Sequence, residues 1–142
     1  MNLVQWLNRF LGTVVDNGQC VAFFRRFIRD VWKVPAFEGV GAENGAKELY
    51  NWHDKLPTQK MNCDRITYNG KNRPRPGDAV IFDASQTNKY GHVGIYIGEL
   101  PDGSFMLASQ NGLKALDGKP EPSRIEQWTW DRVLGWLSPK AA

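Results

Sequence analysis

The spacing of apolar residues changes along this chain. In the first third they recur every three or four positions, whereas beyond residue 78 they alternate or form short unbroken runs. The first pattern is typical of amphipathic helices and the second of β-strands. We therefore expect N-terminal helices packed on an antiparallel sheet, which is an α+β fold.

Three helices are expected in the first part of the chain. The first spans 3–11, and the second spans about 17–33, with Asp16 or Asn17 as its N-terminal cap. A weaker third helix covers 43–53. The second helix matters most, because the first of the two cysteines lies in its opening turn.

Four strands are expected after residue 78. They cover 78–83, 92–100, 104–109 and 132–138. The preceding stretch is rich in Pro, Gly and Asn and is expected to form turns. "PDG" at 101–103 is a hairpin signal, so the second and third of these strands should pair.

The hairpin has a predictable register. If "PDG" closes it, facing residues have numbers that add up to about 202, and His92 lies opposite 109–111. Alternation places His92 and Gly94 on the same face of their strand. Gly94 would leave room there for a bulky neighbour, such as the helix that carries Cys20.

Length and composition indicate one domain over residues 1–142. The net charge of +3 is mild, and the arginines at 25, 26 and 29 read as a solvated helix face, so no nucleic-acid partner is expected. No apolar run reaches the roughly 18 residues of a membrane span. The first fifteen residues lack a basic segment and a cleavage site, so we expect cytoplasmic synthesis without a signal peptide. The domain is expected to be a monomer.

Cys20 is the first candidate for chemistry. The only other cysteine is Cys63, interpreted as a loop residue, so neither a disulfide framework nor zinc-site spacing is present. A helix N-terminus favours a thiolate, and its N–H groups, with the side-chain amide of Gln19, can hold an oxyanion. The alternative is that Cys20 is a small core residue that happens to lie early in the helix.

A cysteine nucleophile requires a base, and the chain has only two histidines. His53 is interpreted as a solvent-facing residue at a helix end. His92 opens a strand directly after a loop, where a scaffold presents side chains to a cleft. Asn111, near the facing position, can accept a hydrogen bond from the imidazole and fix its tautomer. No metal ligand set and no cofactor motif accompany these residues.

Four segments together resemble one family. "GQC" opening a helix, "RPGDAVIFD", "GHVGIYIG" and "LASQNG", in this order, are similar to the CHAP family of cysteine, histidine-dependent amidohydrolases and peptidases. The resemblance implies a papain-like fold of the NlpC type and hydrolysis of amide bonds in bacterial peptidoglycan. It also implies Cys20 as nucleophile, His92 as base and Asn111 as the third residue.

The chain departs from the family at two points. Ser109 occupies the position where the family usually has a glutamate, so the orienting residue is Asn111 alone or Ser109 in a weaker role. Some members carry an aspartate-rich calcium loop before the cysteine, and this chain offers too few oxygen ligands there.

The expected function is a phage endolysin or tail lysin that acts on the bacterial cell wall as a muramoyl–alanine amidase or a cross-bridge endopeptidase. Two alternatives remain: a wall-binding module without turnover, and a structural part of a phage tail.

Overall fold

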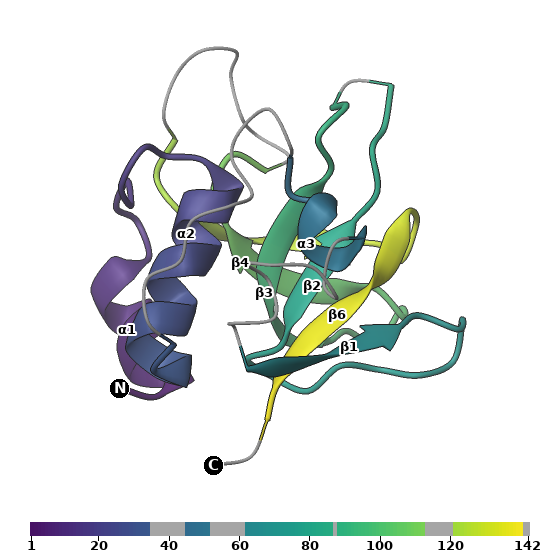
Figure 1. Cartoon of the computed structure of the whole chain (residues 1–142), viewed down its shortest axis with the longest axis horizontal. Coiled ribbons are helices and arrows are strands. Elements are labelled where there is room, and N and C mark those ends of the chain that lie inside the picture. Colours follow the sequence, from purple (N-terminus) through teal and green to yellow (C-terminus); the bar gives the residue numbers. More distant parts are fainter. Residues whose placement is uncertain (35–44, 52–61, 87, 113–120, 141–142) are drawn as a thin grey trace.

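The computed structural model describes residues 1–34, 45–51, 62–86, 88–112 and 121–140. In this part of the chain, N-terminal helices pack against a six-stranded antiparallel sheet (Figure 1). The sheet has the strand order β1-β6-β2-β3-β4-β5. The predicted α+β fold is confirmed.

Helix α1 (Leu3–Phe10) is amphipathic, as its spacing predicts. Asn2 and Gln5 form a reciprocal capping box at its N-terminus, which satisfies two backbone N–H groups that the helix cannot. Trp6 is fully buried, and its indole N–H donates to Asp30 at 2.9 Å. The first helix is therefore tied to the end of the second.

Helix α2 (Cys20–Phe27) runs directly into a five-residue π-helix, η1 (Ile28–Trp32), so the predicted second helix is essentially continuous. The prediction of its cap was wrong. Gln19 is the N-cap residue and no side chain caps the helix, because the Asn17 carboxamide oxygen instead accepts from the Gln19 N–H in a local turn at 3.0 Å. Helix α3 (Glu48–Asn51) falls within the third predicted helix, and His53 lies outside the described residues.

All four predicted strands are present, together with two that were not predicted. The strands are β1 (Cys63–Thr67), β2 (Ala79–Phe82), β3 (His92–Glu99), β4 (Phe105–Ser109), β5 (Arg124–Trp128) and β6 (Val133–Pro139). The interpretation of Cys63 as a loop residue was wrong. It is a buried thiol outside any disulfide that opens β1, an edge strand hydrogen-bonded to β6.

The β3–β4 hairpin has nearly the predicted register. Ile95 faces Ala108 and Tyr96 faces Leu107, one residue from the predicted pairing, before a bulge shifts the ladder by one more. Gly94 was expected to make room for the helix that carries Cys20, and this expectation was wrong. A side-chain carbon at Gly94 would strike Leu107 at 2.5 Å and Ser109 at 3.0 Å, so the glycine lets β4 approach, not the helix.

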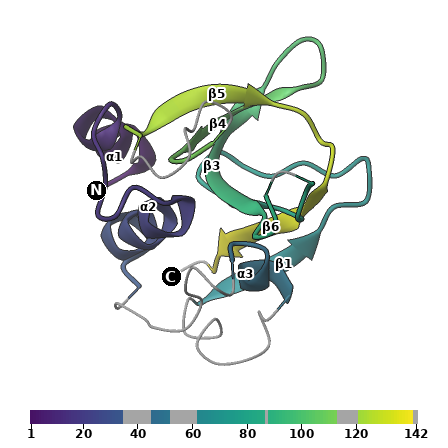
Figure 2. The same cartoon turned by 90° about the horizontal axis from the view of Figure 1, so that it is seen from above.

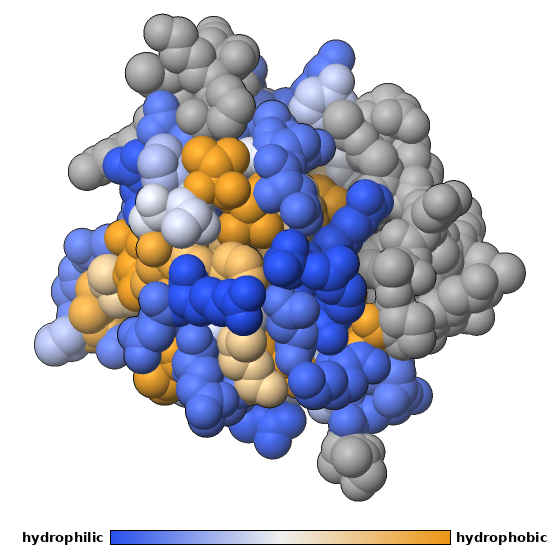
Figure 3. All heavy atoms as spheres, turned by 90° about the vertical axis from the view of Figure 1, so that its left-hand side faces the viewer, coloured by the Kyte–Doolittle hydropathy of each residue, from blue (hydrophilic) through white to orange (hydrophobic). Residues whose placement is uncertain are grey.

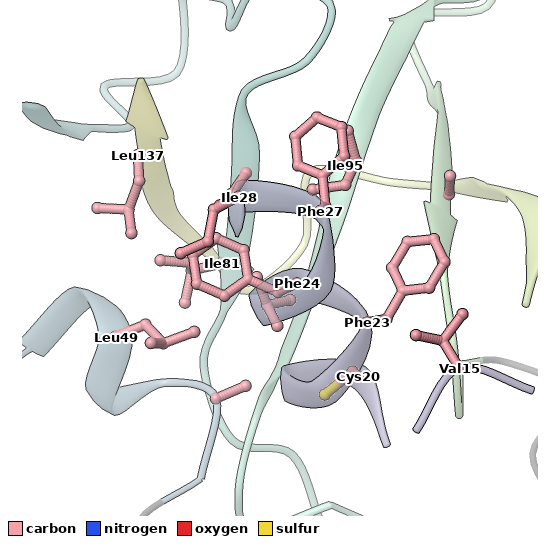
Figure 4. Close-up of a cluster of buried hydrophobic side chains, with 14 of the residues drawn as sticks. Val15, Cys20, Phe23, Phe24, Phe27, Ile28, Leu49, Ile81, Ile95 and Leu137 are labelled. Carbon is pink, nitrogen blue, oxygen red and sulfur yellow. The ribbon is translucent and has the colours of Figure 1, made fainter. Parts of the chain in front are cut away.

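The two faces of the sheet bury different groups of side chains. One face lies under α2 (Figure 2). The phenylalanines of this helix share a buried cluster with side chains of β2, β3 and β6 (Figure 4). The other face is lined by aromatic and aliphatic residues, namely Val80, Phe82, Tyr96, Phe105, Leu107 and Trp136. Successive residues of each strand thus contribute to opposite cores.

The outer surface on the helical side mixes hydrophobic and charged side chains (Figure 3). Val4 and Val14 are the most exposed of its larger apolar residues, at 64% and 44%. None of the described helices combines the length and the hydrophobicity needed to cross a bilayer.

Candidate active site

Cys20 is the first residue of α2 and points into the interface between that helix and the sheet (Figure 4). Its side chain is 9% exposed. Burial raises the pKa of the Cys20 thiol to about 11, while the backbone N–H groups of Val93, Val21 and Cys20 itself act in the opposite direction. The sulfur is therefore within reach of the backbone amide that directly follows His92.

The loop before Cys20 is held by a side chain that the sequence analysis did not identify. Gln110 is fully buried at the end of β4. Its amide N–H groups donate to the carbonyls of Val15 at 3.0 Å and Gln19 at 3.1 Å, and its oxygen accepts from the Val15 N–H. These three bonds fix both ends of the turn that leads into the helix. None of them reaches a free N–H group of the first helical turn, so they hold the loop without capping the helix.

His92 opens β3, as predicted, and is 4% exposed. Its Nε2 lies 3.0 Å from the Ser109 hydroxyl. The indole of Trp128 stacks on the imidazole with ring centroids 4.7 Å apart and planes 11° from parallel. Burial lowers the pKa of His92 to about 3, so the ring is neutral at pH 7 and available as a base.

Asn111 was predicted to bond to the imidazole of His92, but its side chain bonds to Gln19 instead. Its side-chain N–H donates to the Gln19 side-chain oxygen at 2.8 Å, which orients the amide expected to bind an oxyanion. Asn111 also has a φ of +54°, a left-handed conformation that asparagine tolerates better than most residues. In this structure, then, Ser109 contacts the imidazole and Asn111 contacts Gln19.

A cavity of about 190 Å³ opens beside His92. Its lining includes His92, Asn111 and Trp128, with Asp83 and Arg132 supplying one charge of each sign. Cys20 is outside this lining, on the helix side of the sheet. The cavity thus reaches the predicted base and the predicted third residue, but not the sulfur.

The structure links Cys20 to the His92 segment through the backbone amide of Val93, which the sulfur reaches. Among the hydrogen bonds of the described residues, none joins the sulfur to the imidazole. The raised pKa of Cys20 and the lowered pKa of His92 leave both groups neutral at pH 7, so the free protein does not hold a preformed thiolate–imidazolium pair. The described residues hold no cluster of three His, Cys, Asp or Glu side chains that fits a metal ion.

The role of Gln110 and the stacking of Trp128 on His92 were not predicted, although Trp128 is one of several aromatic residues that the sequence offers near the cleft. Gln110 directly follows β4, and continued alternation would place it on the face opposite Ser109, so the strand pattern contained a signal for it. Trp128 lies in β5, which was not predicted as a strand. Its stacking on His92 had no signal in the local sequence.

The fold and the pair of residues define a class: papain-like α+β proteins with a cysteine at a helix N-terminus and a histidine at the start of a neighbouring strand. The sequence matches the CHAP domain family over residues 12–111, and the chain belongs to this family. The match includes all five predicted site residues, Gln19, Cys20, His92, Ser109 and Asn111. No curated protein matched the sequence.

Solved structures share the fold at low sequence identity. The wild-type endolysin LysIME-EF1 is 20% identical with a TM-score of 0.70, and the alignment covers 96% of this chain and 62% of that one. Ly7917 with the hydrolyzing product of MDP is 20% identical with a TM-score of 0.68, covering 94% and 59%. An N-acetylmuramoyl-L-alanine amidase from Staphylococcus aureus is 20% identical with a TM-score of 0.52, covering 87% and 31%. The chain therefore spans about three fifths of the first two proteins.

Proposed function

We propose that this protein is a peptidoglycan hydrolase that cleaves an amide bond of the bacterial cell wall by a cysteine–histidine mechanism. The observation that carries the proposal is the position of the Cys20 sulfur at the N-terminus of α2, within reach of the backbone amide of Val93, the residue that follows His92. Membership of the CHAP family supports the same chemistry.

The reaction begins with the thiol. As the Cys20 sulfur attacks the carbonyl carbon, its proton passes to the unprotonated ring nitrogen of His92, and a tetrahedral oxyanion forms. The imidazolium then gives this proton to the leaving amine, and the carbon–nitrogen bond breaks to leave a thioester on Cys20. Water attacks the thioester with His92 as base, which releases the acid and restores the thiol.

The oxyanion is held at the start of α2. The Cys20 backbone N–H and the Gln19 side-chain N–H are the donors, and Asn111 orients the second of them by bonding to the oxygen of the same amide. The Gln110 side-chain N–H donates to the backbone carbonyl of Gln19 and so fixes the Gln19 backbone. A donor held in place before the reaction loses little energy to reorganisation as charge develops.

The site of action is the cell wall, and the substrate is the peptide part of peptidoglycan. The S. aureus neighbour is an N-acetylmuramoyl-L-alanine amidase and LysIME-EF1 is an endolysin. We assign the same class to this chain, with cleavage either of the muramoyl–alanine bond or of a cross-bridge peptide.

The test uses purified peptidoglycan and the variant Cys20→Ala, with Cys63→Ala as the matched control for removing a buried thiol. Wild type and Cys63→Ala should clear the suspension and release new amino groups, while Cys20→Ala should release none and keep its circular dichroism spectrum. Mass spectrometry of the fragments identifies the bond. Binding of wild type to the wall without release of fragments would favour a binding module, consistent with the low exposure of Cys20.

A further inference from the structure

A buried carboxylate lies on the same side of the sheet as His92. Glu126, in β5, is 7% exposed and faces Leu107 of β4 across the ladder. Its neighbours on this face are mostly apolar, including Phe82, Phe105 and Leu107. A carboxylate is costly to bury in such surroundings unless polar contacts compensate it. The mechanism above makes no use of Glu126.

Gly112 shows how close Glu126 lies to the His92–Ser109 pair. A side-chain carbon at Gly112 would come within 2.4 Å of the Glu126 carboxylate oxygen Oε1 and 3.4 Å of the Ser109 hydroxyl. It would also lie 3.3 Å from the indole of Trp128, which stacks on His92. The carboxylate, the hydroxyl and the indole therefore border one small space above Gly112.

We propose that Glu126 is a positioning residue that acts on His92 through Ser109. The serine hydroxyl can either donate to Nε2 or accept from it. A carboxylate near the hydroxyl attracts its hydrogen, which leaves the oxygen lone pairs for an Nε2–H. Glu126 thereby selects the tautomer with hydrogen on Nε2 and leaves Nδ1 unprotonated to take the Cys20 proton.

The inference deepens the proposed function and rests on it. In a serine-protease triad a carboxylate touches the imidazole directly and holds its tautomer. Here a serine stands between the two groups, on the strand next to the imidazole, and the carboxylate comes from one strand further along the sheet. The negative charge also stabilises the imidazolium that forms during attack.

Glu126→Gln tests the charge with little change of shape. We expect kcat to fall about 10- to 100-fold, with KM within about twofold, because the substrate does not touch Glu126. Glu126→Asp should recover part of kcat. Glu99→Gln, which removes a carboxylate paired with Arg73 elsewhere on the sheet, is the control and should retain wild-type kcat.

The pH profile separates this role from a purely structural one. Among the described residues, the charged groups around His92 are Asp83 and Arg132 in the cavity, Arg124 opposite Ser109 on β5, and Glu126 near Ser109. Because Asp83 and Arg132 are unchanged in Glu126→Gln, loss of the Glu126 charge should move the acidic limb of kcat to lower pH. An acidic limb and a kcat equal to those of wild type would overturn the proposal.

A double-mutant cycle tests the route through Ser109. Glu126→Gln should reduce kcat less than twofold in a Ser109→Ala background, since the intermediate hydroxyl is gone. Equal effects in both backgrounds would contradict the route.

A measurement on the wild-type protein covers the case in which Glu126→Gln does not fold. Nitrogen-15 chemical shifts of His92 should show hydrogen on Nε2, and hydrogen on Nδ1 would exclude the proposed tautomer. This result does not depend on catalysis. An inactive protein with the Nε2–H tautomer would therefore refute the proposed function alone, whereas an active protein with the Nδ1–H tautomer would refute only the role of Glu126.

Discussion

The two faces of the sheet hold the two halves of the candidate site by different forces. On the face under α2, Cys20 belongs to one buried cluster with Phe23, Phe24 and Ile95 (Figure 4). On the opposite face, His92 is held by the Ser109 hydroxyl and the stacked indole of Trp128. Apolar packing dominates around α2, with the three Gln110 bonds at the start of the helix, whereas directional contacts position the imidazole. Changes to the packing residues of α2 should therefore appear in stability, and changes to the contacts of His92 in turnover.

His92→Gln should have the largest effect on turnover. Loss of a general base typically reduces kcat about 10²- to 10⁴-fold, while the free energy of unfolding at pH 7 should change little, because glutamine can still bond to Ser109. Kinetics on purified peptidoglycan and urea denaturation measure the two quantities. A variant that loses stability and activity in proportion would contradict the separation of roles.

Phe27→Ala is the matching change on the helix face. The ring is fully buried and lies edge-on to Trp6 with centroids 5.2 Å apart. Its removal should lower the free energy of unfolding by about 3–5 kcal/mol, measured by urea denaturation. The folded fraction should keep wild-type kcat within about twofold. A large loss of kcat in fully folded protein would show that this face also controls chemistry.

Acid should weaken the fold through His92. The native pKa of about 3 lies below the ordinary value of 6.5, so between these pH values the unfolded chain binds a proton that the native protein does not. The free energy of unfolding should fall with decreasing pH by up to about 1.4 kcal/mol per pH unit from this group. Parallel denaturation curves at pH 7 and pH 4.5 for wild type and His92→Gln test this. The same loss in both proteins would assign it to other groups.

Asn111→Gly should reduce kcat by about tenfold. Glycine accepts the left-handed backbone at this position, so the variant removes the bond to Gln19 without adding strain. The expected loss is smaller than the 10²- to 10³-fold typical of deleting an oxyanion donor itself. In the Asn111→Gly background, Gln19→Ala should reduce kcat by a smaller factor than it does in the wild-type protein. Independent effects would indicate that Asn111 acts elsewhere.

The smallest expected effect is the change in the rate of Cys20 alkylation with pH. In a Cys63→Ser background, which should keep kcat within about twofold, Cys20 should react slowly with iodoacetamide at pH 7 and faster above pH 8, since its pKa is about 11. Mass spectrometry follows the adduct. Rapid alkylation that does not vary between pH 5 and 8 would indicate a thiolate–imidazolium pair in the free protein.

Periodicity predicted the strands that carry alternating apolar residues, and the "PDG" turn placed Ile95 within one residue of its observed partner. It failed for β1 and β5. Their exposed positions include Asp64, Arg65 and Gln127, which read as loop when the pairing strands are unknown. Edge strands of this kind are fixed by tertiary pairing more than by local sequence.

In the candidate site, too, the features set by local sequence were predicted and those set by tertiary contacts were not. Cys20 and His92 were predicted because so few cysteines and histidines compete with them. The partners of Gln110 are 95 and 91 positions away, and Glu126 approaches Ser109 only through the ladder between β4 and β5. Contacts of this range depend on the register of several strands, which no local pattern specifies.

The place of β6 bears on synthesis. Among the six described strands, β6 comes last in the sequence, yet it inserts between β1 and β2 and so joins the edge strand to the rest of the sheet. These hydrogen bonds cannot form until the ribosome has released β6. A stop codon shortly before Val133 should therefore leave β1 and β2 without their shared partner and yield an insoluble product.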